Sequence, residues 1–162
     1  MDKLFPPTIV LRHRKENLKK CSLRGLEARE DFCFYTYPRE ELPPLHGYIY
    51  LVLEEAPPLS KQDAHRGLFV LDATWRYAER MEKQVEPQLL HCEPRTLPGA
   101  WVTAYPRKQE DCPAPDRGLA SIEAIYISYL LLGHPTAGLL DQYYWAEEFL
   151  RRNAALITQC LT

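Results

Sequence analysis

Short runs of apolar and aromatic residues, separated by polar residues and prolines, recur through the first two thirds of the chain. They cover residues 8–11, 32–37, 48–53, 68–71 and 100–104. β-Branched and aromatic residues at successive positions are typical of strands, and a fully apolar run is typical of a strand buried on both faces. We therefore expect five strands, most of them in a parallel sheet.

Helical patterns alternate with these runs. Ser60 is suited to cap a short helix that has Asp63 at its third position. The predicted helices are this short one, 75–85, one that starts at Ser121 and stops at Gly133, and 141–160. Alternation of strands and helices predicts an α/β fold.

The run at 68–71 leads directly into Asp72, Ala73, Thr74 and Trp75. In open α/β sheets, ligands bind at the carboxyl ends of strands, just before a helix. On the predicted helix, Trp75 shares one face with Ala78 and Glu82. Asp72 and Trp75 are therefore candidate ligand contacts, with helix capping by Asp72 and core packing by Trp75 as the structural alternatives.

Prolines at positions 87, 94 and 98 interrupt the pattern in the middle of the chain. They predict a boundary between an N-terminal α/β half, residues 1–94, and a C-terminal half, residues 95–162.

Charge is distributed unevenly along the 162 residues. Residues 1–29 hold eight basic and three acidic residues, a net charge of +5, whereas the whole chain carries −2 and the remainder therefore −7. A basic segment on an acidic protein favours a polyanionic partner, and a solvated surface segment is the alternative.

Several classes of protein are not supported by the sequence. No apolar run approaches the roughly 20 residues of a membrane span, and no secretion signal is visible, so we expect a cytoplasmic protein without a membrane partner. The five cysteines form no CxxC pair, which predicts reduced thiols and no metal site. GxGxxG, P-loop, HExxH and nucleophile-elbow motifs do not occur.

Short motifs along the chain resemble those of the ribosomal RNA aminocarboxypropyltransferases of archaea and eukaryotes, and of the related DTW-domain proteins that modify transfer RNA. The central motif is the D-x-x-W element at Asp72 and Trp75. The others are Lys-Cys-Ser at 20–22, Pro-Leu-Ser-Lys-Gln-Asp at 58–63, Arg-Thr-Leu-Pro at 95–98, Leu-Ala-Ser-Ile-Glu-Ala at 119–124, and Trp145, Phe149, Leu150 and Asn153. Residues 103–109 depart from the family's A-N-P-x-N-Y-G stretch, which leaves the RNA substrate open.

The resemblance implies a SPOUT-like α/β fold with a mostly parallel sheet, a knotted C-terminal half and a smaller N-terminal half. It implies that a monomer transfers the 3-amino-3-carboxypropyl group of S-adenosylmethionine (SAM) to N3 of a uridine or pseudouridine in ribosomal RNA, during ribosome biogenesis. Methylthioadenosine is released. The alternatives are the same transfer to a transfer RNA uridine, and a non-catalytic RNA-binding factor of ribosome assembly.

The resemblance also implies roles for individual residues. Asp72 would position the amino group of the transferred moiety or help to deprotonate N3, and positioning is favoured because an ordinary aspartate is a weak base for an imide. Trp75, with Ala78, would bury the methyl group and face the propyl carbon towards the base. The predicted SAM site consists of Ser22, Leu53, Leu71, Asp72, Trp75, Ala78, Leu97, Arg117 and Ser121.

The predicted RNA face consists of basic residues, most of them near the N-terminus. They are Arg12, Arg14, Lys15, Lys19, Lys20, Arg24, Arg107 and Lys108. These side chains would contact phosphates. The target base must be single-stranded or flipped out, because N3 is hidden in a Watson–Crick pair.

Overall fold

A single parallel sheet organises the chain. The computed structural model describes residues 5–15, 23–52, 55–73, 75–106 and 119–161. Within them, five strands pair in the order β2-β1-β4-β3-β5, all of them parallel. They are β1 (Thr8–His13), β2 (Phe32–Tyr37), β3 (Ile49–Leu51), β4 (Leu68–Asp72) and β5 (Glu93–Arg95). This confirms the predicted α/β class and parallel sheet.

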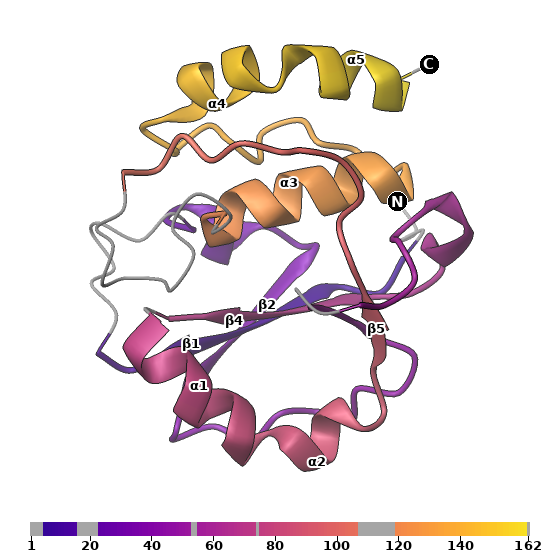
Figure 1. Cartoon of the computed structure of the whole chain (residues 1–162). Coiled ribbons are helices and arrows are strands. Elements are labelled where there is room, and N and C mark those ends of the chain that lie inside the picture. The colour runs from indigo at the N-terminus through magenta and orange to yellow at the C-terminus, as the bar shows by residue number, and fades with distance from the viewer. Residues whose placement is uncertain (1–4, 16–22, 53–54, 74, 107–118, 162) are drawn as a thin grey trace.

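Helices cover both faces of the sheet (Figure 1). On one face lies α3 (Ser121–Leu132), with α4 (Ala146–Arg152) and α5 (Ala154–Leu161) beyond it, and on the other lie α1 (Trp75–Gln84) and α2 (Glu86–Leu89). Single-turn 3-10 helices cover Leu26–Ala28 (η1) and Lys61–Asp63 (η2). Because side chains alternate along a strand, Val10 of β1 joins the core beneath α3 and Leu11 joins the core beneath α1. Burial on both faces explains why residues 9–11 of this strand are all apolar.

Four of the five predicted strands are present. β2 has the predicted bounds, β1 continues two residues further to His13, β3 is shorter than predicted, and β4 includes Asp72. The extension of β1 matters for the site, because it pairs Arg12 with Asp72 across the sheet.

Local chemistry sets two helix ends as predicted. Ser60 and Asp63 form a capping box in which Ser60 Oγ accepts from the Gln62 amide and the Asp63 carboxylate accepts from the Ser60 amide, each at 3.3 Å. After α3, Gly133 has a φ of 81°, in the left-handed region where glycine avoids the strain that a side chain would bring.

The η2 turn is joined to β5 through a buried ion pair. Arg95 donates to both carboxylate oxygens of Asp63, at 3.2 Å each. The pair lies within two of the motifs that the resemblance rests on, 58–63 and 95–98. In this fold those motifs meet, and their charged members hold the edge of the sheet together.

The predicted strand at 100–104 is wrong. The backbone there bonds to side chains instead: Val102 donates to and accepts from the Asn153 amide, at 2.8 Å each, and the Ala104 amide donates to Glu123 at 2.8 Å. An apolar run indicates that a segment is buried and that its backbone N–H and C=O groups need hydrogen-bond partners. It does not indicate whether those partners are another strand or polar side chains. Asn153 also separates α4 from α5, so the predicted helix at 141–160 is two helices.

The prolines in the middle of the chain do not end the sheet. Pro87 lies in the first turn of α2, and Pro94 lies in the edge strand β5, which are both positions where proline is tolerated. Sequence reasoning missed both elements. Residues 94 and 95, where the boundary between two halves was expected, lie inside β5, and the division into halves stays a prediction.

Two observations concern the expected environment of the protein. In the described part of the chain, no helix has the length and apolar character needed to cross a membrane. Cys33, Cys92 and Cys160 have free thiols. Burial raises the pKa of the Cys92 thiol to about 11, which keeps it protonated and unreactive.

Candidate functional site

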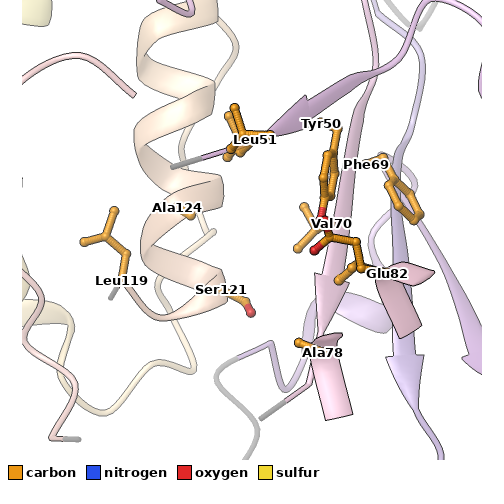
Figure 2. Close-up of a pocket in the computed structure, with 11 residues that line it drawn as sticks. Tyr50, Leu51, Phe69, Val70, Ala78, Glu82, Leu119, Ser121 and Ala124 are labelled. Carbon is orange, nitrogen blue, oxygen red and sulfur yellow. The ribbon is translucent and has the colours of Figure 1, made fainter. Parts of the chain in front are cut away.

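A cavity of about 350 Å³ lies where the carboxyl ends of β3 and β4 meet α1 and the first turn of α3. Figure 2 shows Tyr50, Phe69, Val70, Ala78 and Glu82 on one side, and Leu119, Ser121 and Ala124 on the other. The volume lies in the range of pockets for small organic ligands. The lining residues are Tyr50, Leu51, Val52, Phe69, Val70, Leu71, Ala78, Glu82, Leu119, Ser121 and Ala124.

The topology of the sheet explains why the cavity forms there. In a parallel sheet all carboxyl ends lie at one edge, and each connection leaves from that edge. β4 therefore delivers Leu71 to the cavity and α1, which follows it, delivers Ala78, whereas Ser121 arrives on α3 from much later in the chain. Three residues of the predicted SAM site are thus brought together.

Asp72 ends β4 beside this cavity, and its two carboxylate oxygens have different partners. Ser121 Oγ donates to Oδ1 at 3.2 Å, and Arg12 Nε donates to Oδ2 at 3.3 Å. The Asp72 side chain is 7% exposed. Because the Ser121 proton is directed at the carboxylate, the Ser121 oxygen is left as an acceptor. Together the two residues form an acceptor pair suited to an ammonium group.

Arg12 belongs to this network and not to the predicted RNA face. Its Nη1 donates to Glu27 at 3.1 Å, its guanidinium lies 4.6 Å from the centroid of the Phe34 ring, and its side chain is 9% exposed. The predicted contact with phosphates is therefore corrected: strand pairing buries Arg12 between two carboxylates and an aromatic ring. Partial burial raises the pKa of Glu27, but hydrogen bonds, including the one from Arg12, lower it by more than burial raises it. The net shift of the Glu27 pKa is therefore downward.

Other predicted contacts are placed differently or lie outside the described residues. Leu97 packs against the core and does not line the cavity. Trp75 is the first residue of α1, but its side chain lies outside the described part of the chain. Also outside it are Ser22, Leu53 and Arg117 of the predicted SAM site, and Lys19, Lys20, Arg107 and Lys108 of the predicted RNA face. The described members of that face, Arg14, Lys15 and Arg24, are exposed.

Sequence reasoning missed most of the apolar wall and one acid. Tyr50 and Val70 line the cavity and belong to no motif, whereas Leu119 and Ala124 belong to the motif at 119–124 but were given no ligand role. Glu82 was placed on the predicted helix face of Ala78, and this spacing of one turn is the signal that brings it to the cavity.

His13 ends β1 next to the site and is held in its neutral form. Its ring stacks on Tyr77 with 4.1 Å between centroids, and its Nδ1 accepts a hydrogen bond from the Lys15 amide at 3.1 Å. Burial, followed by the positive charges of neighbouring basic residues, lowers the pKa of His13. Burial also lowers the pKa of His134, whose ring stacks on Phe5.

We expect stability to fall when the pH is lowered from about 7.5 to about 5.5. Both histidines have pKa values below the usual 6.5, so the unfolded chain binds protons first as the pH falls. The loss accumulates between the unfolded and folded pKa values. Urea midpoints at the two pH values measure it. His13→Phe keeps a stacking ring but cannot be protonated, so its decline should be smaller, and an equal midpoint of the parent at both pH values would contradict the prediction.

Comparisons with known proteins bear on the fold. No family model matches the chain, and no curated protein matches it. A similar solved structure is that of the SAM-dependent rRNA:acp-transferase Tsr3 from Vulcanisaeta distributa, with a TM-score of 0.68 and 20% identity over 95% of this chain and 82% of that one. The chain therefore shares the fold of that transferase.

Proposed function

We propose that the protein is an RNA aminocarboxypropyltransferase, which transfers the 3-amino-3-carboxypropyl group of SAM to N3 of a uridine-type base in ribosomal RNA. The observation that carries the proposal is the Asp72–Ser121 acceptor pair beside a largely apolar cavity of about 350 Å³. The fold around that cavity is shared with Tsr3, described as a SAM-dependent rRNA:acp-transferase. The motifs named above support the same activity.

The described residues of the cavity suit the parts of SAM. Leu51, Val70 and Leu119 offer apolar surface for a flat adenine ring. Ser121 and Asp72 offer oxygen acceptors to the ammonium of the methionine moiety, as the hydrogen bond between them leaves the serine oxygen able to accept.

The proposed reaction is one displacement. The bond from N3 to the propyl carbon forms as the bond from that carbon to sulfur breaks. The electron pair goes to sulfur, which becomes the neutral thioether of methylthioadenosine, and the N3 proton passes to water. Asp72, held by Arg12 at 3.3 Å, positions the ammonium so that the propyl carbon, and not the methyl, faces the base.

Exposed cations support an RNA face beside the cavity. Arg14 and Lys15 directly follow β1, at the carboxyl edge of the sheet where the cavity lies, and both are exposed. The proposal retains Arg24 in this face, together with Lys19, Lys20, Arg107 and Lys108. It also retains a knotted, SPOUT-type C-terminal half and a cytoplasmic monomer.

The test is to incubate the protein with SAM and ribosomal RNA and to separate the products by chromatography. We expect methylthioadenosine, and an RNA heavier by one 3-amino-3-carboxypropyl group. S-adenosylhomocysteine would instead indicate methyl transfer and overturn the proposal. Turnover with transfer RNA but not with ribosomal RNA would identify transfer RNA as the substrate. No turnover with either RNA would favour a non-catalytic RNA-binding factor.

Filling the cavity is expected to weaken SAM binding without unfolding the protein. Ala124 lines the cavity on α3, and Ala124→Leu would place a larger side chain in the space proposed for the ligand. We expect at least about a tenfold rise in the Kd for SAM, equivalent to about 1.4 kcal/mol. Ala155→Leu, the same change at an exposed position of α5, is the control. Equal affinities of the two variants would contradict the assignment of the cavity.

A further inference from the structure

Glu82 brings a negative charge to the cavity. Among the described lining residues it is the one with a formal charge, since Tyr50 and Ser121 contribute hydroxyl groups and the others are apolar. Figure 2 shows its side chain on the α1 side of the cavity, across from Ser121 and Ala124 of α3. Glu82 is exposed to solvent and has no ion-pair partner among the described residues.

Asp72, the other carboxylate near the cavity, is already neutralised by a protein cation. Asp72 is matched by Arg12, whose guanidinium lies 3.3 Å from it and 3.1 Å from Glu27. The Asp72 carboxylate is thus paired within a buried network, whereas the Glu82 carboxylate lines the cavity without a cationic partner among the described residues. A cavity wall of this kind, apolar with a single anion, favours a ligand with one positive charge and an apolar body.

We infer that Glu82 is a specificity-determining residue that selects the positively charged sulfonium donor over neutral thioethers, which include the product methylthioadenosine. This inference rests on the proposed function. SAM carries a positive charge on sulfur, which S-adenosylhomocysteine and methylthioadenosine lack. A carboxylate near that sulfur therefore strengthens binding of the donor and leaves binding of the thioethers unchanged, so the spent product leaves while the donor is retained.

The same charge has a defined kinetic consequence. The positive charge on sulfur diminishes as the carbon–sulfur bond breaks, so an anion beside it stabilises bound SAM more than it stabilises the transition state. Removing the anion should raise the KM for SAM and should not lower kcat. A residue that only shapes the cavity would give no such separation between charged and neutral ligands.

The experiment compares Glu82→Gln with Glu79→Gln. Both substitutions remove one negative charge from an exposed position of α1, and Glu79 does not line the cavity. The Kd values of SAM and S-adenosylhomocysteine are measured by calorimetry for the parent and both variants. For Glu82→Gln we expect the preference for SAM over S-adenosylhomocysteine to fall about two- to fivefold, since the group is exposed to solvent. Glu79→Gln should keep the parental preference.

Two further measurements test whether the effect of Glu82 is electrostatic. Raising the salt concentration should reduce the preference of the parent for SAM but not that of Glu82→Gln, and Glu82→Lys should reduce the preference further. Equal weakening of both ligands in Glu82→Gln, or no change in either, would overturn the inference while leaving the proposed function standing. A parent protein that binds neither ligand would overturn the proposed function itself, and the inference with it.

Discussion

Replacing Glu123 by alanine is expected to cost the protein about 4 kcal/mol or more of its stability, which is enough to unfold much of the population of an ordinary domain. Glu123 is fully buried and accepts four hydrogen bonds. The donors are Ala120 N at 2.8 Å, Ala104 N at 2.8 Å, Thr103 Oγ1 at 2.6 Å and Tyr143 OH at 2.9 Å. Alanine leaves all four without this acceptor, in a space that water enters poorly.

The cost is large because Glu123 joins separate parts of the chain. It caps the first turn of α3 through Ala120, binds the segment at 103–104, and accepts a hydrogen bond from Tyr143, which precedes α4. Urea unfolding followed by circular dichroism measures the effect. Glu148→Ala is the control, because Glu148 forms its ion pairs on the surface, where solvent screens them, so its loss should change stability little. A Glu123→Ala protein as stable as this control would contradict the prediction.

Glu123→Gln separates hydrogen bonding from packing. The amide has nearly the shape of the carboxylate, but one of its two ends carries N–H groups and cannot accept. One of the backbone donors, Ala104 or Ala120, then loses its acceptor. We expect a loss smaller than that of Glu123→Ala, of about 1–3 kcal/mol.

Asp72→Asn is expected to lower the kcat/KM for aminocarboxypropyl transfer by about 10- to 100-fold while leaving the protein folded. A hydrogen bond between two charged groups contributes about 1.5–3 kcal/mol, and each 1.4 kcal/mol is about a tenfold change. The neutral amide removes that charge from the acceptor pair with Ser121. Arg12 keeps its bond to Glu27 at 3.1 Å, so the buried guanidinium is not left without a carboxylate.

The rate of methylthioadenosine release from SAM and ribosomal RNA measures this effect, and circular dichroism verifies the fold. Asp141→Asn, at an exposed position, serves as the control for the charge change. Release by Asp72→Asn within twofold of this control would show that the carboxylate does not hold the transferred group. The cavity would then need another anchor for the ammonium.

Local sequence patterns determined much of the fold. The runs at 8–11, 32–37 and 68–71 predicted strands, because β-branched and aromatic residues favour strands and because a strand buried on both faces is apolar at every position. Ser60 and Gly133 predicted helix ends, because capping depends on residues within a few positions of the end. The predicted ligand edge after β4 follows from the same local reasoning, since a strand and the helix after it define that edge by themselves.

Long-range pairing decided the rest. Charge alone assigned Arg12 to an RNA face, whereas its register opposite Asp72 buries it in the site. The apolar segment at 100–104 forms no strand, and its backbone amides bond to the side chains of Asn153 and Glu123 instead.

Glu82 joined the candidate site for the same reason. Its spacing from Ala78 was visible in the sequence, but only the approach of α3 encloses the space that both residues line. The sequence by itself thus determined the parallel sheet, two of its helix ends and the edge of the sheet at which we propose that a ligand binds, since each depends on neighbours along the chain. The tertiary structure alone decided which charges are buried in pairs and which face the cavity, because the partner of a buried group is chosen by packing between elements far apart in sequence.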